Sequence, residues 1–205
     1  MIESWNDFYA RSRVEIQWPE LEKELDAFMH AIGRVSLEWN ALEELFFTYL
    51  TFSKVPNGVA RYLGFKMNNN DKMEVMQVLA EEFETGDPDS YERARTFFRY
   101  ARICTDNRNF LMHSIITGPD ELVFSLRKKS RNSVGNYVIA KFGLTEVRQM
   151  AQDIANTTQF AGRLQMVMFS FPQRLAQTAD GQILAVPLLD PPPEPINWQS
   201  FKVDA

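Results

Sequence analysis

A long seam of apolar residues constrains the fold of this chain more than any other feature. From residue 21 to residue 49, apolar side chains recur at alternating steps of four and three residues, which is the a/d spacing of packed helices. The seam consists of Leu21, Leu25, Phe28, Ile32, Val35, Trp39, Leu42, Phe46 and Tyr49. Pro19 stands at a first helical position, with Glu20 and Glu22 in the first turn. We therefore predict one long helix, or two nearly collinear helices, ending near Ser53.

Three more helices are predicted after the seam. Residues 56–58, which are Pro-Asn-Gly, mark a loop. The polar residues 68–71 can cap a second helix that continues to residue 83. A third helix is expected over residues 90–113, with Ser90 as its cap. The last helix opens at residue 144 and stops at Pro172, because proline cannot continue a helix.

The pattern changes period between the third and the last helix. Residues 122–126 and 137–142 look like two strands joined by a basic stretch. The sequence thus predicts a mainly α protein, an antiparallel helical bundle with a small β-hairpin inserted before the last helix. We divide it into an N-terminal extension (1–18), a helical domain (19–172) and a Pro-rich tail (173–205). The tail's composition is more typical of a flexible end than of a docking ligand.

The sequence contains few of the residue patterns that bind metals or cofactors. Two histidines and one cysteine form no CxxC or HExxH pattern, and the nine glycines form no phosphate-binding loop. We therefore expect no metal site and no cofactor. The single Cys104, the lack of a signal-like N-terminus and the short apolar runs favour a cytoplasmic protein without a membrane span. The net charge of −5 means that nucleic-acid binding would need a local basic patch.

The third predicted helix carries two stripes that bear on function. One is polar, and at about 100° per residue it aligns Arg102, Asp106, Asn109 and His113. The other is apolar except for one arginine, and it aligns Phe97, Ala101, Cys104, Arg108 and Leu111. Arg108 is therefore expected to face the bundle or a partner chain, roughly 140° from His113 on a regular helix. The two can meet only if the helix ends or distorts near Asn109, if two chains share the site, or both.

The run Arg108-Asn109-Phe110-Leu111-Met112-His113 resembles the signature of the HEPN superfamily (higher eukaryotes and prokaryotes nucleotide-binding domain). Arg108, Asn109 and His113 match its Arg-polar-x-x-x-His pattern near the end of a helix. The resemblance extends more loosely over residues 20–171, including the first long helix and the hairpin after the motif. Many members carry Gly after the His, where this chain has Ser114.

The resemblance implies a metal-independent endoribonuclease of toxin or defence type. The ribose 2′-hydroxyl would attack the adjacent phosphate, with His113 as general base or acid. Arg108 would stabilise the charged phosphate, and Asn109 would orient the histidine or hold the phosphate. The family pairs its domains, so we expect a homodimer with a composite cleft that binds RNA or a nucleotide. An antitoxin or another protein would be a further partner.

Several residues support more than one interpretation. His113 could simply interact with the helix dipole, and Arg108 could form a structural ion pair with Glu38, Glu43 or Glu44. We assign Arg102 and Asp106 to substrate binding because they share the polar stripe. The basic tip of the hairpin is either a solvated turn or a contact for a nucleic-acid backbone; its residues are Arg127, Lys128, Lys129 and Arg131. The alternative function is a non-catalytic HEPN-like module that binds nucleotides or proteins.

Overall fold

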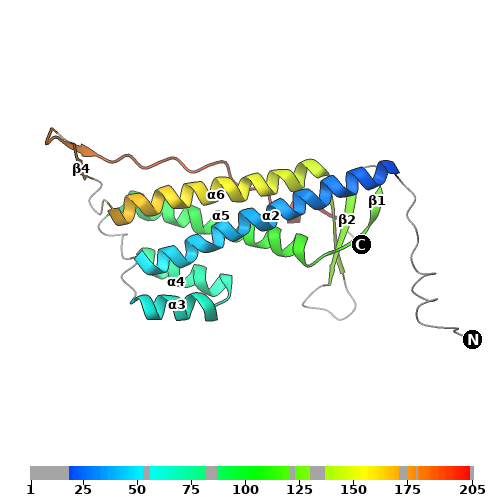
Figure 1. Cartoon of the computed structure of the whole chain (residues 1–205), viewed down its shortest axis with the longest axis horizontal. Helices are drawn as coiled ribbons and strands as arrows, with labels where there is room; N and C mark the ends of the chain where they lie inside the picture. Colours follow the sequence, from blue (N-terminus) through cyan, green and yellow to red (C-terminus); the bar gives the residue numbers. More distant parts are fainter. Residues whose placement is uncertain are drawn as a thin grey trace, which may run out of the picture.

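The structure is a computed structural model that describes residues 19–52, 56–81, 87–120, 123–129, 137–170, 175–178 and 180–203. Its long axis follows three helices that lie side by side (Figure 1): α2 (Pro19–Phe52), α5 (Pro88–Met112) and α6 (Leu144–Ser170). The predicted extension over residues 1–18 lies outside the described residues. None of the described helices is both long enough and apolar enough to cross a membrane.

The three long helices do not all alternate in direction. α5 runs opposite to α2 and α6, which run in the same direction (Figure 1). A hydrogen bond links the C-terminal parts of the two parallel helices: Gln165 Nε2 of α6 donates to the Leu45 carbonyl of α2 at 3.0 Å. The predicted helical bundle is therefore present, but it is not antiparallel throughout as predicted, because α2 and α6 pack directly on each other in parallel and only α5 runs the opposite way.

The apolar seam of α2 forms the centre of the core, as its spacing predicts. From Phe28 to the end of the seam the innermost side chains are at most 2% exposed: Phe28, Val35, Trp39, Leu42, Phe46 and Tyr49. Phe46 contacts Trp39 edge-on, with ring centroids 6.1 Å apart, and also meets Phe97 of α5. Burial of each such side chain stabilises the fold by about 1.5–3 kcal/mol. The seam thus joins α2 to the other two long helices.

A short helix occupies the stretch for which the sequence predicts a loop. α3 (Asn57–Lys66) begins immediately after Pro56, whose carbonyl accepts the N–H groups of Val59 and Ala60. The prediction of a loop at residues 56–58 was therefore wrong. Pro-Asn-Gly also suits a helix start, since Pro56 supplies an extended residue before the first turn.

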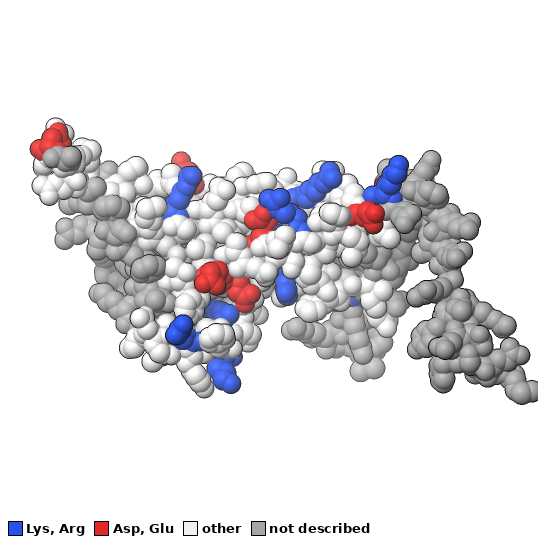
Figure 2. All heavy atoms as spheres, in the orientation of Figure 1, with Lys and Arg blue, Asp and Glu red and all other residues white. Residues whose placement is uncertain are grey.

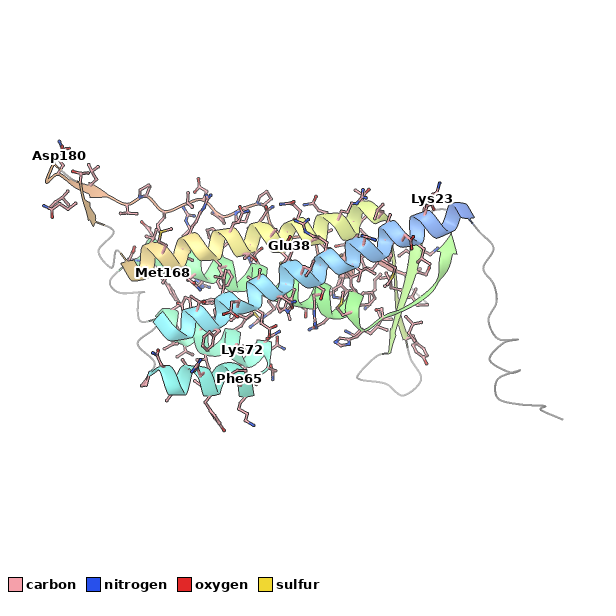
Figure 3. All side chains as sticks on the ribbon, viewed as in Figure 1. Lys23, Glu38, Phe65, Lys72, Met168 and Asp180 are labelled. Carbon is pink, nitrogen blue, oxygen red and sulfur yellow. The ribbon has the colours of Figure 1, made fainter. Side chains whose placement is uncertain are left out.

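α3 packs on α2 with one side and leaves the other side open to solvent. A Cβ on Gly64 would lie 2.8 Å from the Phe47 ring, so the missing side chain allows the close approach. The opposite side of α3 is apolar and open, and Phe65 projects away from the bundle (Figure 3) with 89% of its surface exposed. α4 (Asn69–Glu81) follows and matches the second predicted helix. Its Lys72 reaches back to Glu43 of α2 at 3.3 Å.

The predicted hairpin is the centre of a larger antiparallel sheet at one end of the bundle. β2 (Val123–Lys129) pairs with β3 (Tyr137–Phe142), which confirms the two strands. β1 (Ile115–Asp120), which the sequence did not predict, adds outside β2, and β6 (Lys202–Val203) adds outside β3. The order is therefore β1-β2-β3-β6.

The C-terminal segment is packed along the bundle. A small hairpin of β4 (Leu175–Gln177) and β5 (Ile183–Ala185) lies at the far end, and the chain then returns to the sheet (Figure 1). A 3-10 helix, η1 (Trp198–Phe201), precedes β6. Pro195 is buried, and Trp198 stacks on Phe110 of α5 with ring centroids 4.2 Å apart. The expected flexible end is thus a packed segment over its second half.

Candidate functional site

The Arg-Asn-x-x-x-His run closes α5. The helix ends at Met112, and His113 is its C-cap, with φ −109° and ψ 12° and an exposed side chain. Ser114 follows, and its hydroxyl donates a hydrogen bond to the Phe110 carbonyl at 2.5 Å. α5 therefore stays helical through Asn109, and the helix end or distortion near Asn109 that would let Arg108 and His113 of one chain meet is absent.

Arg108 is half-buried and is hydrogen-bonded to its neighbour in the motif, Asn109. Its Nη1 donates a hydrogen bond to Asn109 Oδ1 at 3.1 Å, while its Nε is buried without a hydrogen-bond partner in the described part of the chain. The predicted ion-pair alternatives are otherwise engaged or absent among the described residues. Glu38 pairs with Arg34 at 2.6 Å, Glu43 pairs with Lys72, and no ion pair of Glu44 with Arg108 occurs.

The basic strand β2 lies against the end of α5. Lys128 Nζ donates a hydrogen bond to the Asn109 carbonyl at 3.0 Å and lies 6.0 Å from the centre of the Phe110 ring. Arg127 is opposite Ile115 in the sheet, two residues after His113. Of the predicted basic residues, the structure thus brings Lys128 to the motif and places Arg127 only by its backbone pairing.

The other predicted basic residues give less information. Arg127 and Lys129 belong to β2, but their side-chain surroundings lie outside the described features, and Arg131 lies outside the described residues. Arg102 and Asp106 are exposed on α5, about two turns and one turn before Asn109, respectively. They confirm the polar stripe as a solvent-facing one, since His113 at its end is exposed as well.

Two neighbouring cavities open along this stripe. The first has a volume of about 560 Å³ and is lined by Arg95, Arg99, Arg102 and Asp106, among others. The second has a similar volume and is lined by Asp106, Asn109, Lys128, Trp198 and three consecutive asparagines, Asn68, Asn69 and Asn70. Both fall within the range of small-ligand sites. Neither lining includes Arg108 or His113.

Asp106 connects the two cavities and has a perturbed acidity. Partial burial raises the pKa of its carboxyl above the ordinary value, and the nearby positive charges of Arg102 and Lys128 oppose that rise. The carboxylate therefore sits in a place that disfavours its charge, between two cations that partly compensate.

Sequence reasoning missed Asn107, which holds the C-terminal segment. Its side chain is fully buried, donates from Nδ2 to the Ile196 carbonyl at 2.7 Å and accepts from the Trp198 N–H at 2.8 Å. Asp153 of α6 adds a third bond by accepting the Ile196 N–H at 3.0 Å. A signal existed: Asn107 lies three residues from Cys104 and Phe110, on an apolar face where an amide needs partners.

Cys104 is the only cysteine and lies in the core beneath the motif, as its stripe predicts. Burial raises the pKa of its thiol to about 12, with a contact to the Thr157 hydroxyl at 3.7 Å acting in the opposite direction.

We therefore expect a thiol-directed disulfide reagent at pH 8 to label the native chain far more slowly than the urea-unfolded chain. The folded thiol holds about a thousandfold less thiolate than an ordinary one. Equal labelling rates in both states would contradict this.

The described residues contain no cluster of three or more histidine, cysteine or carboxylate side chains that could hold a metal ion. No protein-family model, curated protein or solved structure matches the chain. The groups available for chemistry at this end of α5 are an exposed histidine, a half-buried arginine hydrogen-bonded to an asparagine, and a lysine on the adjoining strand.

Proposed function

We propose that this chain is a metal-independent endoribonuclease of the HEPN type, with a toxin or defence role. The observation that carries the proposal is the end of α5, where the Arg-Asn-x-x-x-His run closes a long bundle helix and presents its histidine to solvent. Lys128 on the adjoining strand adds positive charge beside the run, which suits a polyanionic substrate.

The proposed reaction needs two proton-transfer groups. The ribose 2′-oxygen forms a bond to the adjacent phosphorus while the bond from phosphorus to the 5′-oxygen breaks, leaving a cyclic phosphate. One group accepts the 2′-hydroxyl proton and another protonates the departing 5′-oxygen. Each chain supplies one motif histidine, so a homodimer with facing motifs would supply both groups, His113 and His113 of the partner subunit.

Arg108 and Asn109 take the electrostatic part of this proposal. A planar guanidinium can hold two phosphate oxygens at once and stabilise the charge that develops on phosphorus. Asn109 accepts a hydrogen bond from Arg108 Nη1, which makes it a positioning residue for the arginine. α5 stays helical to Met112, so Arg108 and His113 of one chain diverge by roughly 140°. That divergence favours a site shared by two chains.

The test is cleavage of single-stranded RNA by the purified chain in excess chelator. We expect products with cyclic phosphate ends, and no cleavage at a position where one 2′-deoxynucleotide replaces the ribonucleotide, since the attacking hydroxyl is then missing. Cleavage at the phosphate on the 3′ side of the deoxynucleotide, or activity that disappears with chelator, would contradict the mechanism. The oligomeric state of the same preparation tests the shared site.

A non-catalytic nucleotide-binding module is the second candidate. The observation that favours it is the second cavity, which combines amide groups, Lys128 and Trp198 but does not include His113 in its lining. Under this alternative a nucleotide binds without turnover, and His113→Ala leaves its affinity unchanged.

A further inference from the structure

Three arginines follow one face of α5 and form the floor of a groove. Arg95, Arg99 and Arg102 are four and three residues apart, so they are neighbours on the helix surface, and all three are exposed. They line the first cavity together. At 1.5 Å of rise per residue they cover about 10 Å of the helix, which gives several successive phosphates of one strand a guanidinium each.

The two cavities adjoin at Asp106, and we treat them together as one groove. Asp106 lines both, so the floor is α5 throughout. One wall is α4, because Gln77 lines the first cavity and Asn68–Asn70, at the start of α4, line the second. The other wall is the returning C-terminal segment, because Asn197 lines the first cavity and Trp198 and Gln199 line the second.

The second cavity differs from the first in chemistry. Its lining combines asparagine amides, which can donate and accept at a base edge, with the indole of Trp198. Trp198 is held in place by its stacking on Phe110, with an interplanar angle of 13°. A held aromatic ring beside amide groups is the arrangement that single-stranded RNA-binding proteins use for an unpaired base.

Charge distribution also singles out this groove. Across both linings the cations are Arg95, Arg99, Arg102 and Lys128, against the carboxylates Glu92 and Asp106, although the whole chain carries a net charge of −5. On the face that α2 and α6 present, in contrast, positive and negative side chains are interspersed (Figure 2).

We infer that this groove binds single-stranded RNA, with phosphates on the three arginines of α5 and an unpaired base in the second cavity beside Asn109. The inference deepens the proposed ribonuclease function and rests on it for the choice of RNA as the polymer. It assigns the groove to the part of the strand that leads into the cleavage site. A duplex does not fit this role, because its paired bases cannot enter the second cavity.

The existing ion pairs of the groove do not block this binding. Arg95 lies 3.3 Å from Glu92, and Arg99 lies 3.8 Å from Glu194 of the C-terminal segment. All four side chains are more than half exposed, and exposed pairs of this kind contribute little to stability. A phosphate can therefore replace the carboxylate partner at small cost.

The test measures binding separately from cleavage. In a His113→Ala background, the affinity of a fluorescently labelled single-stranded RNA is measured by anisotropy over a range of salt concentrations. Changing Arg95, Arg99 and Arg102 together to Gln is expected to weaken binding at least about tenfold and to reduce the salt slope by about 2, near 0.7 for each lost phosphate contact. The matched control changes Arg34 of α2 and Arg148 and Arg163 of α6 to Gln. It removes the same three positive charges from the chain, but outside the groove.

A second variant, which is expected to keep the fold, tests the second cavity. Asn70→Asp adds a negative charge at the exposed start of α4, where helices tolerate acidic residues, and it should weaken RNA binding several-fold. Asn57→Asp makes the same change at the start of α3, away from the groove, and should leave binding unchanged. Thermal unfolding confirms that each variant is folded.

The outcomes separate the groove from the proposed function. Equal affinity of the α5 triple variant and its control, or equal binding of duplex and single-stranded RNA, would overturn the inference that this groove binds single-stranded RNA. If the groove binds RNA as expected but the wild-type chain cleaves none, the ribonuclease proposal fails while the groove stands.

Discussion

Replacing His113 with alanine is expected to lower the rate of RNA cleavage by about 10²–10⁴-fold, the usual contribution of a general acid or base. The side chain is exposed at the C-cap of α5, so its removal leaves no cavity in the core and the fold should persist. The measurement is the initial rate of cleavage in chelator. His30, the other histidine of the chain, is exposed on α2, and His30→Ala provides the matched control with an unchanged rate.

The shared site gives this prediction a sharper form. If both proton-transfer groups come from two chains, a mixed dimer with one His113→Ala chain lacks one of them. After subunit exchange, activity should then fall as the square of the wild-type fraction. A linear fall would mean that each chain carries a complete site. Full activity of His113→Ala itself would remove the histidine from the mechanism altogether.

Arg108 offers a second measure of the same site. Arg108→Lys keeps the positive charge but loses the planar pair of donors and the geometry of the bond to Asn109. We expect it to cleave far more slowly than wild type while keeping the same oligomeric state as wild type. Preserved activity in Arg108→Lys would assign the arginine a role as a simple charge.

Asn107→Leu is expected to destabilise the folded chain by about 1–3 kcal/mol, because two half-buried backbone groups would lose their partners. The side chain is fully buried and binds both the Ile196 carbonyl and the Trp198 N–H. Leucine has a similar shape, so the change removes hydrogen bonds with little change in packing. Urea unfolding measures the loss in free energy.

The control for this prediction is Asn40→Leu, which makes the same exchange at an exposed site on α2 and should change stability by a few tenths of a kcal/mol. Proteolysis should also cut the C-terminal segment of Asn107→Leu before it cuts the helices. Equal unfolding free energies for Asn107→Leu and wild type would show that the C-terminal segment is held by its other contacts, such as the bond from Ile196 to Asp153.

Local patterns predicted most of the helical fold. The a/d seam of α2 needed only periodic spacing, and Pro19 and Phe52 bound the helix within a residue of the expected ends. Two local signals misled the interpretation. Pro-Asn-Gly at residues 56–58 opens α3 instead of a loop, and Gly118-Pro119 conceals β1, where the strand register shifts between Ile116 and Pro119.

The groove could not be predicted because its parts are far apart in the sequence. Asp106 and Asn109 were assigned to a polar stripe from helical spacing alone, and the structure confirms that spacing. The asparagines before α4 and Trp198 join them only through tertiary packing. Asn107 was detectable as a buried amide on an apolar face, but its partners lie about ninety residues further along the chain.

The returning C-terminal segment also sets the order in which these parts come into existence. A ribosome completes α5 and its motif long before it adds residues 196–203, which supply Trp198, one groove wall and the edge strand β6. Until those residues are synthesised and packed, α5 and its motif lack this wall and the sheet lacks its edge strand.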